Sequence, residues 1–440
     1  MTTRKTTGTP AKRGVKPPAR AKPHVRTGPA KPPRSARRPA RKGPDEAGRD
    51  DAITRGDRTE RKARTERVTS SRPGSKSSGR PAPKRPAKKV VRKAPAKKVP
   101  SRTIGTAADV ESQLLAIEGG DGDGSIDLGG GKSLRVTSLK KAFFEENSVT
   151  KGAVMRYYTR ISRFILPDIE GRPLILKRYP DGMAGAMFYQ QEAGEHVPDA
   201  VRVSSVETAE KGRQDRIIGG DLPTLLYTVQ LGAIEVHPWF SRVQDIESPD
   251  RCLIDLDPGE GVPFPLVVEL AQEIVRIARE CELPVVLKTS GSRGIHLVFP
   301  LPARTTYETS AALATLIARA SVAARPDLAT VERSLSARPP RTIYVDAMQN
   351  AHGKSMAGAY SIRARPLATV SAPLRPRELT PRLKIGGFTV STMPQRSERI
   401  GDIWREGLAN RPTARALARA MQVVESTLSA DRPTRGTKRS

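Results

Sequence analysis

The first 105 residues of the chain contain no Leu, Phe, Tyr or Trp, and this composition excludes a packed hydrophobic core from that part of the sequence. They carry 33 Lys and Arg against 7 Asp and Glu, whereas the other 335 residues account for only +5 of the net charge of +31. Such a segment cannot bury enough apolar surface to offset its chain entropy. We therefore expect residues 1–105 to form a disordered basic arm.

The arm is suited to binding a polyanion. Repeats of the Ala-Lys-Lys-Val kind occur at residues 87–90 and 96–99, and pairing such lysines with phosphates would make binding steeply dependent on salt. Nucleic acid is the favoured partner. A solubilising tail with no dedicated partner is one alternative, and an anionic membrane surface is another, although the arm has no aromatic or amphipathic anchor.

Composition also divides the rest of the chain. We interpret residues 106–132 as an acidic, glycine-rich linker with one short helix at 107–118, residues 133–420 as the folded domain, and residues 421–440 as a C-terminal tail.

Cys252 and Cys281 are too few for a disulfide framework and are expected to be reduced core thiols. No stretch is apolar over the length needed to span a bilayer, so we expect a cytoplasmic, nucleoid-associated protein without a membrane partner.

Helical and strand patterns alternate in the folded domain. Apolar spacing predicts helices over 149–166, with Thr150 as the N-cap and an end before Pro167, and over 266–282 and 307–324. Strands are predicted at 173–177 and 226–236 and before each of the acidic positions described next. This alternation indicates an α+β or α/β domain with a central sheet flanked by helices.

Three carboxylates end apolar runs. Asp255 and Asp257 are two residues apart on one predicted strand, so their side chains share a face, and Asp346 ends another run. Carboxylates held together repel one another unless a cation lies between them, and a hard divalent ion such as Mn²⁺ or Mg²⁺ prefers oxygen ligands. Phosphoryl transfer is the chemistry that most needs such a site. Solvated surface acids, or a strand-end cap at Asp346, are the alternatives.

Other polar side chains suit a nucleotide. Residues 290–294 (Ser-Gly-Ser-Arg-Gly) predict a tight turn whose backbone N–H groups, Ser290 hydroxyl and Arg293 guanidinium could contact phosphate, although a plain hairpin turn has the same composition. His237 and His296 lie in or beside these segments and could equally be satisfied core groups. Arg363 and Arg365 are predicted to share one strand face and form a cationic wall, or else a solvated charged face.

In their order along the chain, these segments resemble the archaeo-eukaryotic primase superfamily, and most closely the stand-alone form of the polymerase domain of bacterial ligase D. The resemblance runs from about residue 134 to residue 404. The segments that carry it are Leu134-Arg135-Val136-Thr137 through Lys151, Lys177 to Gly182, Phe188-Tyr189-Gln190, Leu231 to Trp239, Asp255 to Gly259, Thr289 to His296, and Val345 to Asn350.

The resemblance implies roles for individual residues. Asp255, Asp257 and Asp346 would be the catalytic ligands of Mn²⁺ or Mg²⁺. The incoming NTP or dNTP would be held by His237, Ser290, Arg293, His296, Gln349, Arg363 and Arg365. DNA with gaps or broken ends would be contacted by Lys141, Lys151, Arg178 and Phe188, of which the two lysines match a pocket for the 5′-phosphate and Phe188 matches an aromatic that packs on template bases.

The sequence departs from the family pattern at Arg293, where lysine is expected, and at Tyr189, where the family has a second phenylalanine. No Lys-x-Asp-Gly ligase signature occurs in the chain. The resemblance implies a polymerase that fills gaps and extends ends in non-homologous end joining, that favours ribonucleotides, and that acts in partnership with Ku. Because the signature is missing, we expect its ligase to be a separate protein. A primase that starts strands de novo and a non-catalytic, architectural DNA-binding protein are the alternatives.

Overall fold

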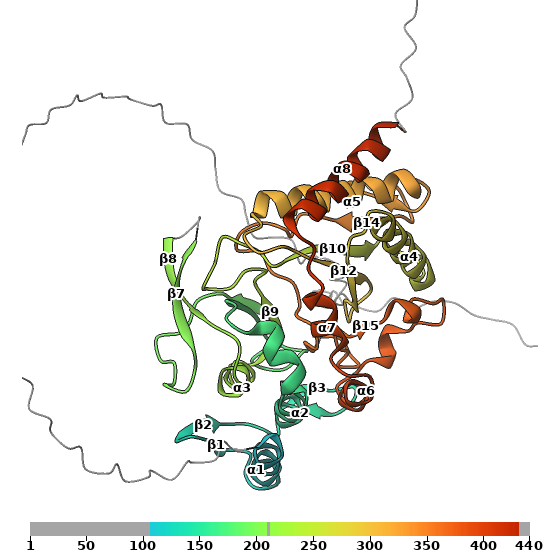
Figure 1. Ribbon diagram of the computed structural model, residues 1–440. Helices are drawn as coiled ribbons and strands as arrows, with labels where there is room; N and C mark the ends of the chain where they lie inside the picture. Colours follow the sequence, from blue (N-terminus) through green and yellow to red (C-terminus); the bar gives the residue numbers. More distant parts are fainter. Residues whose placement is uncertain (1–105, 209–211, 431–440) are drawn as a thin grey trace, which may run out of the picture. The chain divides into compact units, whose positions relative to one another are not determined.

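The computed structural model describes residues 106–208 and 212–430, so the basic arm predicted for residues 1–105 lies outside the described residues. Within these ranges the chain has the mixed α+β fold that the sequence predicts (Figure 1). No helix in the same two ranges is both long enough and apolar enough to cross a bilayer.

A six-stranded sheet carries the segments that end in acidic residues. Its strand order is β13-β14-β10-β12-β11-β15, and neighbouring strands are antiparallel except for β13 and β14. The strands are β10 (Arg251–Pro258), β11 (Val286–Thr289), β12 (Ile295–Pro300), β13 (Ala329–Thr330), β14 (Ile343–Asp346) and β15 (Pro373–Leu374). The strand with the paired aspartates, β10, therefore lies between β14 and β12.

Two helices, α4 (Phe264–Glu280) and α5 (Tyr307–Ala324), cover one face of this sheet, and α8 (Ala414–Ala430) packs against α5. Figure 1 shows them grouped beside β10 and β14. Ile254 and Leu256 point from β10 into the core that these helices form. Because side chains alternate along a strand, Asp255 and Asp257 must point to the opposite face.

The opposite face contacts a second core, to which Leu253 and Val298 contribute. This core is built on a three-stranded sheet of order β6-β5-β9 and on two helices that contact each other. These elements are β5 (Leu174–Arg178), β6 (Phe188–Gln190), β9 (Ala233–Pro238), α2 (Lys151–Ile169) and α3 (Leu222–Gln230). The acidic face of the large sheet is thus turned toward the part of the fold that carries β5 and β9.

Shorter elements complete the fold. They are α1 (Ala107–Gly119), β1 (Gly124–Gly129), β2 (Lys132–Val136), β3 (Ala142–Phe144), β4 (Val149–Thr150), β7 (Val203–Thr208), β8 (Gly212–Ile217), η1 (Pro376–Glu378), η2 (Ile385–Gly387), α6 (Met393–Ile400) and α7 (Ile403–Ala409). The pairs β1–β2, β3–β4 and β7–β8 are antiparallel.

Several predicted elements are present. The helix over 307–324 is α5, the helix over 266–282 is α4 with a two-residue shift, and α2 begins where Thr150 caps it by accepting a hydrogen bond from the backbone N–H of Ala153. The predicted end of α2 before Pro167 is wrong, because the helix continues to Ile169. A proline in the last turn removes only one hydrogen bond, and the buried side chain of Ile169 packs in the core.

The linker predicted at 106–132 is wrong beyond its helix. Strands β1 and β2 form a hairpin, and Ile126 and Leu134, which face each other across it, are buried in the same core as Val110 of α1. The glycine run 129–131 supplies the turn, since all three residues have positive φ. Glycine content here marks a hairpin turn instead of a flexible connection.

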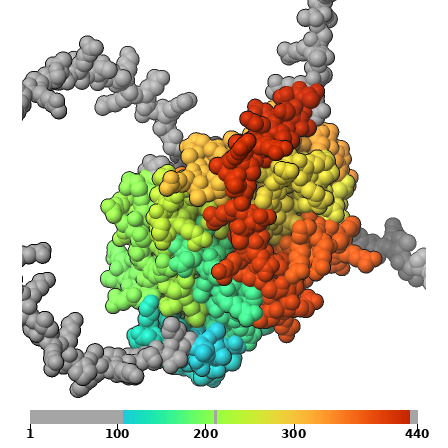
Figure 2. Space-filling model, viewed as in Figure 1, coloured from blue at the N-terminus to red at the C-terminus, as the bar shows by residue number. Residues whose placement is uncertain are grey.

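Two further predictions need correction. Residues 222–230 form α3 in place of the start of the strand predicted at 226–236, because Asp221 caps the helix by accepting from the N–H of Thr224 at 2.9 Å. The tail predicted at 421–440 is helical through residue 430, and Val424 of α8 is buried. Helix α8 is the red segment that lies across the surface in Figure 2. Residues 431–440 lie outside the described residues.

Candidate active site

Four polar residues form a row across the large sheet. Asp346, Asp255, His296 and Lys288 lie directly opposite one another on β14, β10, β12 and β11. Residues opposite each other on neighbouring strands share a face, so this row belongs to the face away from α4 and α5. We call it the acidic row. It brings together three residues that the sequence predicted and one, Lys288, that it did not.

The three aspartates differ in exposure and in partners. The side chain of Asp255 is 22% exposed and that of Asp257 is 41% exposed, while Asp346 is buried. Asp346 accepts hydrogen bonds from the N–H of Met348 at 2.7 Å and from Nε2 of Gln349 at 3.2 Å. Gln349 therefore orients this carboxylate at the end of β14.

Asp257 lies two residues beyond the row, at the open end of β10, and faces two guanidinium groups. Arg293 Nη2 is 3.4 Å from its Oδ1, and Arg338 Nη1 is 3.5 Å from its Oδ2. Burial raises the pKa of Asp257, and the neighbouring Asp255 carboxylate raises it further. Arg338 lies over the ring of Tyr344. The sequence did not predict Arg338 as a site residue, because its loop, residues 331–342, has no regular pattern.

The three aspartates offer the oxygen ligands that a hard cation prefers, although their side chains are not placed together as a metal site. Within residues 106–208 and 212–430, no three His, Cys, Asp or Glu side chains are placed together as a metal cluster. Asp255, Asp257 and Asp346 nevertheless offer only oxygen atoms from one sheet face, which is the ligand type that Mn²⁺ and Mg²⁺ take. Of these three aspartates, Asp257 is the one that faces two guanidinium groups, those of Arg293 and Arg338.

Lys288 holds the histidine of the row in place. It is only 3% exposed, and its Nζ donates to the carbonyl of Ala357 and to Oγ of Ser371, both at 2.8 Å, while also contacting Nδ1 of His296. Burial lowers the pKa of Lys288 well below its usual value. The other ring nitrogen of His296, Nε2, lies 3.3 Å from Oδ1 of Asp255. Lys288 thus fixes the ring that faces the Asp255 carboxylate.

A second polar cluster surrounds Glu235 on β9, and we call it the Glu235 cluster. Oε2 of Glu235 lies 2.8 Å from Nε of Arg363 and 3.0 Å from Nε2 of His237, and its Oε1 lies 3.8 Å from Nζ of Lys177. Burial alone would raise the pKa of Glu235, but the cations, with Arg363 foremost, hold it well below its usual range. Burial also lowers the pKa of His237. The sequence did offer a signal for Glu235, because it is an acidic residue two positions before His237 in an apolar strand. It was not among the predicted site residues.

The turn between β11 and β12 is a hairpin whose polar groups are largely used internally. Oγ of Ser290 accepts from the N–H of Ser292 at 3.1 Å and from that of Gly294 at 2.9 Å. Gly291 has a φ of +71°, and a Cβ on Gly294 would lie 2.0 Å from the carbonyl oxygen of Leu256. The structure therefore places Ser290 as a turn-forming hydroxyl, and Arg293 as the group of this turn that faces the acids.

The shared strand face predicted for Arg363 and Arg365 is wrong. The chain turns here, with the N–H of Arg365 donating to the carbonyl of Arg363 at 2.8 Å. Arg363 is buried and contacts Glu235 and the carbonyl of Ser290, while Arg365 is partly exposed. The prediction rested only on the spacing of two residues between the arginines, which is typical of one face of a strand. A tight turn at this point removes the alternation of side chains on which the prediction depended.

The residues predicted to contact DNA form two pairs, Lys141 with Lys151 and Arg178 with Phe188. Lys151 begins α2 and Lys141 precedes β3, and the N–H of Lys151 donates to the carbonyl of Lys141 at 2.8 Å. Burial and the charge of Lys141 lower the pKa of Lys151 to about 8. Phe188 is 44% exposed on β6, with the guanidinium of Arg178 4.9 Å from its ring centre.

Comparison with known proteins decides the family. The family model that describes the LigD primase-polymerase domain matches residues 150–404 of this sequence. The chain belongs to this family. The α+β fold and the ligase D resemblance predicted from the order of the motifs are therefore confirmed.

Relatives of the LigD family agree. The bifunctional non-homologous end joining protein LigD of Bacillus subtilis is 33% identical over 269 residues, covering 61% of this chain and 43% of that protein. The multifunctional LigD of Pseudomonas aeruginosa is 28% identical over 293 residues, covering 65% and 34%. The chain thus spans less than half the length of these relatives. The polymerase domain of Mycobacterium tuberculosis ligase D, solved in complex with DNA, has a TM-score of 0.59 and 28% identity, covering 63% of this chain and 99% of that domain.

Proposed function

We propose that the chain is a DNA-directed nucleotidyltransferase that fills gaps and extends broken ends during non-homologous end joining. The observation that carries the proposal is the acidic row, in which Asp346 and Asp255 face each other across two strands beside His296. Both bacterial relatives are named as non-homologous end joining proteins, and the similar Mycobacterium tuberculosis polymerase domain was solved bound to DNA. These relatives support the pathway and the substrate class.

The carboxylates would hold the divalent ion. Asp255 and Asp346 present oxygens from adjacent strands, and Asp257 presents them from the open end of β10. A bound Mn²⁺ or Mg²⁺ would neutralise charge on the triphosphate and lower the pKa of the primer 3′-hydroxyl. In the transfer step, the 3′-oxygen bonds to the α-phosphorus, and the bond to the pyrophosphate leaving group breaks.

The nucleotide would lie between the acidic row and the Glu235 cluster. Arg293 contacts Asp257 only at 3.4 Å, so its guanidinium retains donors for phosphate oxygens, whereas the guanidinium of Arg338 also donates to the carbonyls of Glu332 and Arg333. Glu235 anchors two of the predicted ligands. The other residues proposed to hold the nucleotide are His237, Ser290, His296, Gln349, Arg363 and Arg365. We propose that ribonucleotides are favoured over deoxyribonucleotides.

The DNA would contact the first part of the fold. Lys151 begins α2, and the amine of Lys141, which pairs with Asp181 at 3.0 Å, is close enough for its charge to lower the pKa of Lys151. A 5′-phosphate beside the two lysines would be paired with both amines. Exposed Phe188 offers a ring for stacking on a base, and Arg178 lies against that ring. Gapped DNA with a 5′-phosphate should therefore be used better than the same gap with a 5′-hydroxyl, and Lys141→Ala/Lys151→Ala should abolish the difference.

Partners complete the proposal. Ku and a separate ligase would act with this chain at a break, and the basic segment 1–105 would raise the local concentration of DNA near the domain. Joining of linear DNA by this chain with a cognate Ku and ligase tests the partnership. Deletion of 1–105 should weaken binding at low salt while leaving turnover on saturating DNA unchanged. Loss of all turnover would contradict a merely tethering arm.

The test of the function is extension of a labelled primer across a short gap with Mn²⁺, comparing NTP with dNTP. The decisive variant is Asp255→Asn/Asp257→Asn. A matched control is Glu280→Gln/Glu282→Gln, which also neutralises two acids two residues apart, but at exposed positions at the end of α4. Extension by the wild type and the control, and none by the aspartate variant, is expected.

Each other outcome excludes a specific part of the proposal. Equal extension by the aspartate variant would exclude the acidic row as the catalytic centre. No extension by any protein that still binds the gapped DNA would exclude polymerase activity and leave an architectural DNA-binding protein. Efficient synthesis on single-stranded template without a primer would identify a primase instead. A preference for dNTP would contradict only the proposed sugar preference.

A further inference from the structure

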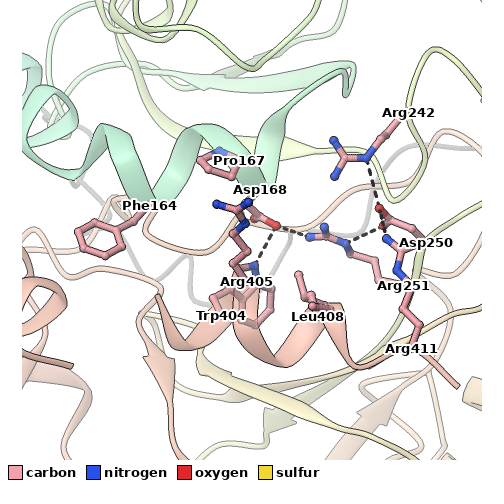
Figure 3. A pocket seen from close by; sticks show the side chains of 11 residues that line it. Phe164, Pro167, Asp168, Arg242, Asp250, Arg251, Trp404, Arg405, Leu408 and Arg411 are labelled. Carbon is pink, nitrogen blue, oxygen red and sulfur yellow. Dashed lines mark hydrogen bonds and ion pairs between the residues drawn. The ribbon is translucent and has the colours of Figure 1, made fainter. Parts of the chain in front are cut away.

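A cavity of about 190 Å³ lies at the start of β10, apart from the acidic row (Figure 3). Asp250 and Arg251 line it, whereas Asp255, the residue of the acidic row on the same strand, lies four residues further along β10 and does not line the cavity. At about 3.3 Å per residue, Arg251 and Asp255 are roughly 13 Å apart. The cavity is therefore distinct from the proposed catalytic site.

The inner wall of the cavity is charge-balanced. Arg251 is paired with both acids, through Nη1 to Oδ1 of Asp168 at 2.6 Å and through Nε to Oδ1 of Asp250 at 3.0 Å. Fully buried Arg172 also contacts Asp250. Nε1 of Trp404 donates to the same oxygen of Asp168 at 2.8 Å. Two guanidiniums thus meet two carboxylates, and this buried set needs no further ion.

Three more arginines, Arg242, Arg405 and Arg411, line the same cavity, and the acids near them are Asp402 and the Asp250 carboxylate that Arg172 and Arg251 already contact. Arg242 Nε and Arg411 Nη2 approach Asp250 only at 3.4 and 3.5 Å, which is longer than the usual 2.7–2.9 Å of a charge-assisted hydrogen bond. Arg405 forms no ion pair with any residue that the structure describes. Figure 3 shows these side chains around the cavity. We call this group the arginine pocket.

The excess charge at the arginine pocket is not a property of the whole fold. Residues 106–430 contain 40 Lys and Arg against 38 Asp and Glu, so the folded part is nearly neutral. Four arginines and two aspartates line the cavity, so an excess of two cations around this small space is a local feature. Guanidinium groups form bidentate hydrogen bonds to phosphate, which favours that anion over a monovalent halide.

We propose that the arginine pocket binds a phosphate group, with Arg242, Arg405 and Arg411 as its ligands. The cavity of about 190 Å³ is smaller than the roughly 300–1,000 Å³ of pockets for drug-sized ligands. It thus suits a phosphate or pyrophosphate, and it is too small to enclose a whole nucleotide. The group could belong to a free anion or to a nucleic-acid backbone that runs past the mouth of the cavity.

The proposal is tested by titrating the full chain with inorganic phosphate at constant ionic strength and following the ³¹P line width and the thermal midpoint. The test variant is Arg405→Ala/Arg411→Ala. The control is Arg415→Ala/Arg419→Ala, which removes the same charge from exposed positions of the neighbouring helix α8. We expect saturable binding that weakens at least tenfold in the test variant and is unchanged in the control. Phosphate bound at the catalytic site would affect all three proteins equally.

A charge-preserving variant separates a specific pocket from a diffuse field. Arg405→Lys/Arg411→Lys keeps both charges but loses the planar donor pairs, so its affinity for phosphate should lie between those of the wild type and the alanine variant. Identical titrations for wild type and alanine variant, or a linear response that sulfate and chloride reproduce, would overturn the proposal. Near-ultraviolet circular dichroism of each variant verifies that the fold is intact.

A competition experiment identifies the source of the phosphate. A short DNA duplex without terminal phosphates is added to the phosphate-loaded wild type, and the pocket-specific broadening, defined as the part lost in Arg405→Ala/Arg411→Ala, is measured again. Release of phosphate by the duplex assigns the pocket to the nucleic-acid backbone. Retention of phosphate with the duplex bound assigns it to a free anion such as phosphate or pyrophosphate.

Discussion

The substitution Glu235→Gln should be strongly destabilising because it leaves buried cations without a counter-ion. Glu235 is 2% exposed, and it contacts Arg363 at 2.8 Å, His237 at 3.0 Å and Lys177 at 3.8 Å. Glutamine preserves the shape and one acceptor oxygen, but it removes the negative charge. Breaking a buried ion pair on one side costs about 3–5 kcal/mol. Since one acceptor is retained, we expect the free energy of unfolding to fall by about 3 kcal/mol.

Urea denaturation followed by tryptophan fluorescence measures this change. The two tryptophans of the chain, Trp239 and Trp404, are both buried, so their emission reports on loss of the core. Glu398→Gln is the matched control, because Glu398 pairs with Arg163 at the surface, with more than half of each side chain exposed. An exposed pair of this kind contributes about 0–1 kcal/mol.

The dependence on pH gives an independent readout. The pKa of Glu235 is held well below its ordinary value of 4.5, so its contribution to stability is complete above that pH and is lost as the pH falls below it. The difference in unfolding free energy between wild type and Glu235→Gln should be constant from about pH 7 to about pH 5 and should shrink in more acidic solution. A difference under about 1 kcal/mol at neutral pH, or equal effects of Glu235→Gln and Glu398→Gln, would refute the reasoning.

Two further substitutions test a close backbone contact and a buried hydrogen bond of the fold. Gly294→Ala should separate β12 from β10, because its Cβ would lie 2.0 Å from the carbonyl oxygen of Leu256. We expect the free energy of unfolding, measured by urea denaturation, to fall by more than about 2 kcal/mol. An unchanged denaturation midpoint would contradict that close approach. Trp404→Phe removes the indole N–H that donates to Asp168, whose Oδ2 already has no hydrogen-bond partner among the described residues. Nε1 of Trp239 also has no hydrogen-bond partner among the described residues, so Trp239→Phe removes no hydrogen bond. By circular dichroism, Trp404→Phe should therefore cost about 1–2 kcal/mol more than the control Trp239→Phe, and equal losses would show that the hydrogen bond contributes nothing.

Sequence patterns predicted best where one rule decides the outcome. Asp255 and Asp257 interrupt an apolar strand at alternate positions, so their common face followed from strand geometry alone. Helix α5 and the N-cap of α2 likewise follow from apolar spacing and from a hydroxyl before the first turn. The opposition of Asp255 and Asp346 could not be predicted in this way, because register between distant strands is set by tertiary packing.

The partners of the predicted residues were the part that sequence could not supply. Lys288 lies eight residues before His296, yet only the pairing of β11 with β12 brings them together. Arg363 is 128 residues from Glu235, and their contact depends on a turn whose residue spacing is also typical of a strand. The hairpin β1–β2 was hidden because glycine and acidic residues outnumber its four buried apolar side chains. In each case a long-range contact decided the local outcome.

The most direct test of nucleotidyl transfer follows the phosphates of the substrate. Gapped DNA is incubated with Mn²⁺ and a nucleoside triphosphate radiolabelled at either the α-phosphate or the γ-phosphate, using the wild type and Asp255→Asn/Asp257→Asn. We predict that the α-label enters the DNA, that the γ-label leaves as pyrophosphate, and that neither occurs with the variant. Absence of α-label from DNA that the wild type binds, or equal incorporation by the variant, would contradict nucleotidyl transfer at the acidic row.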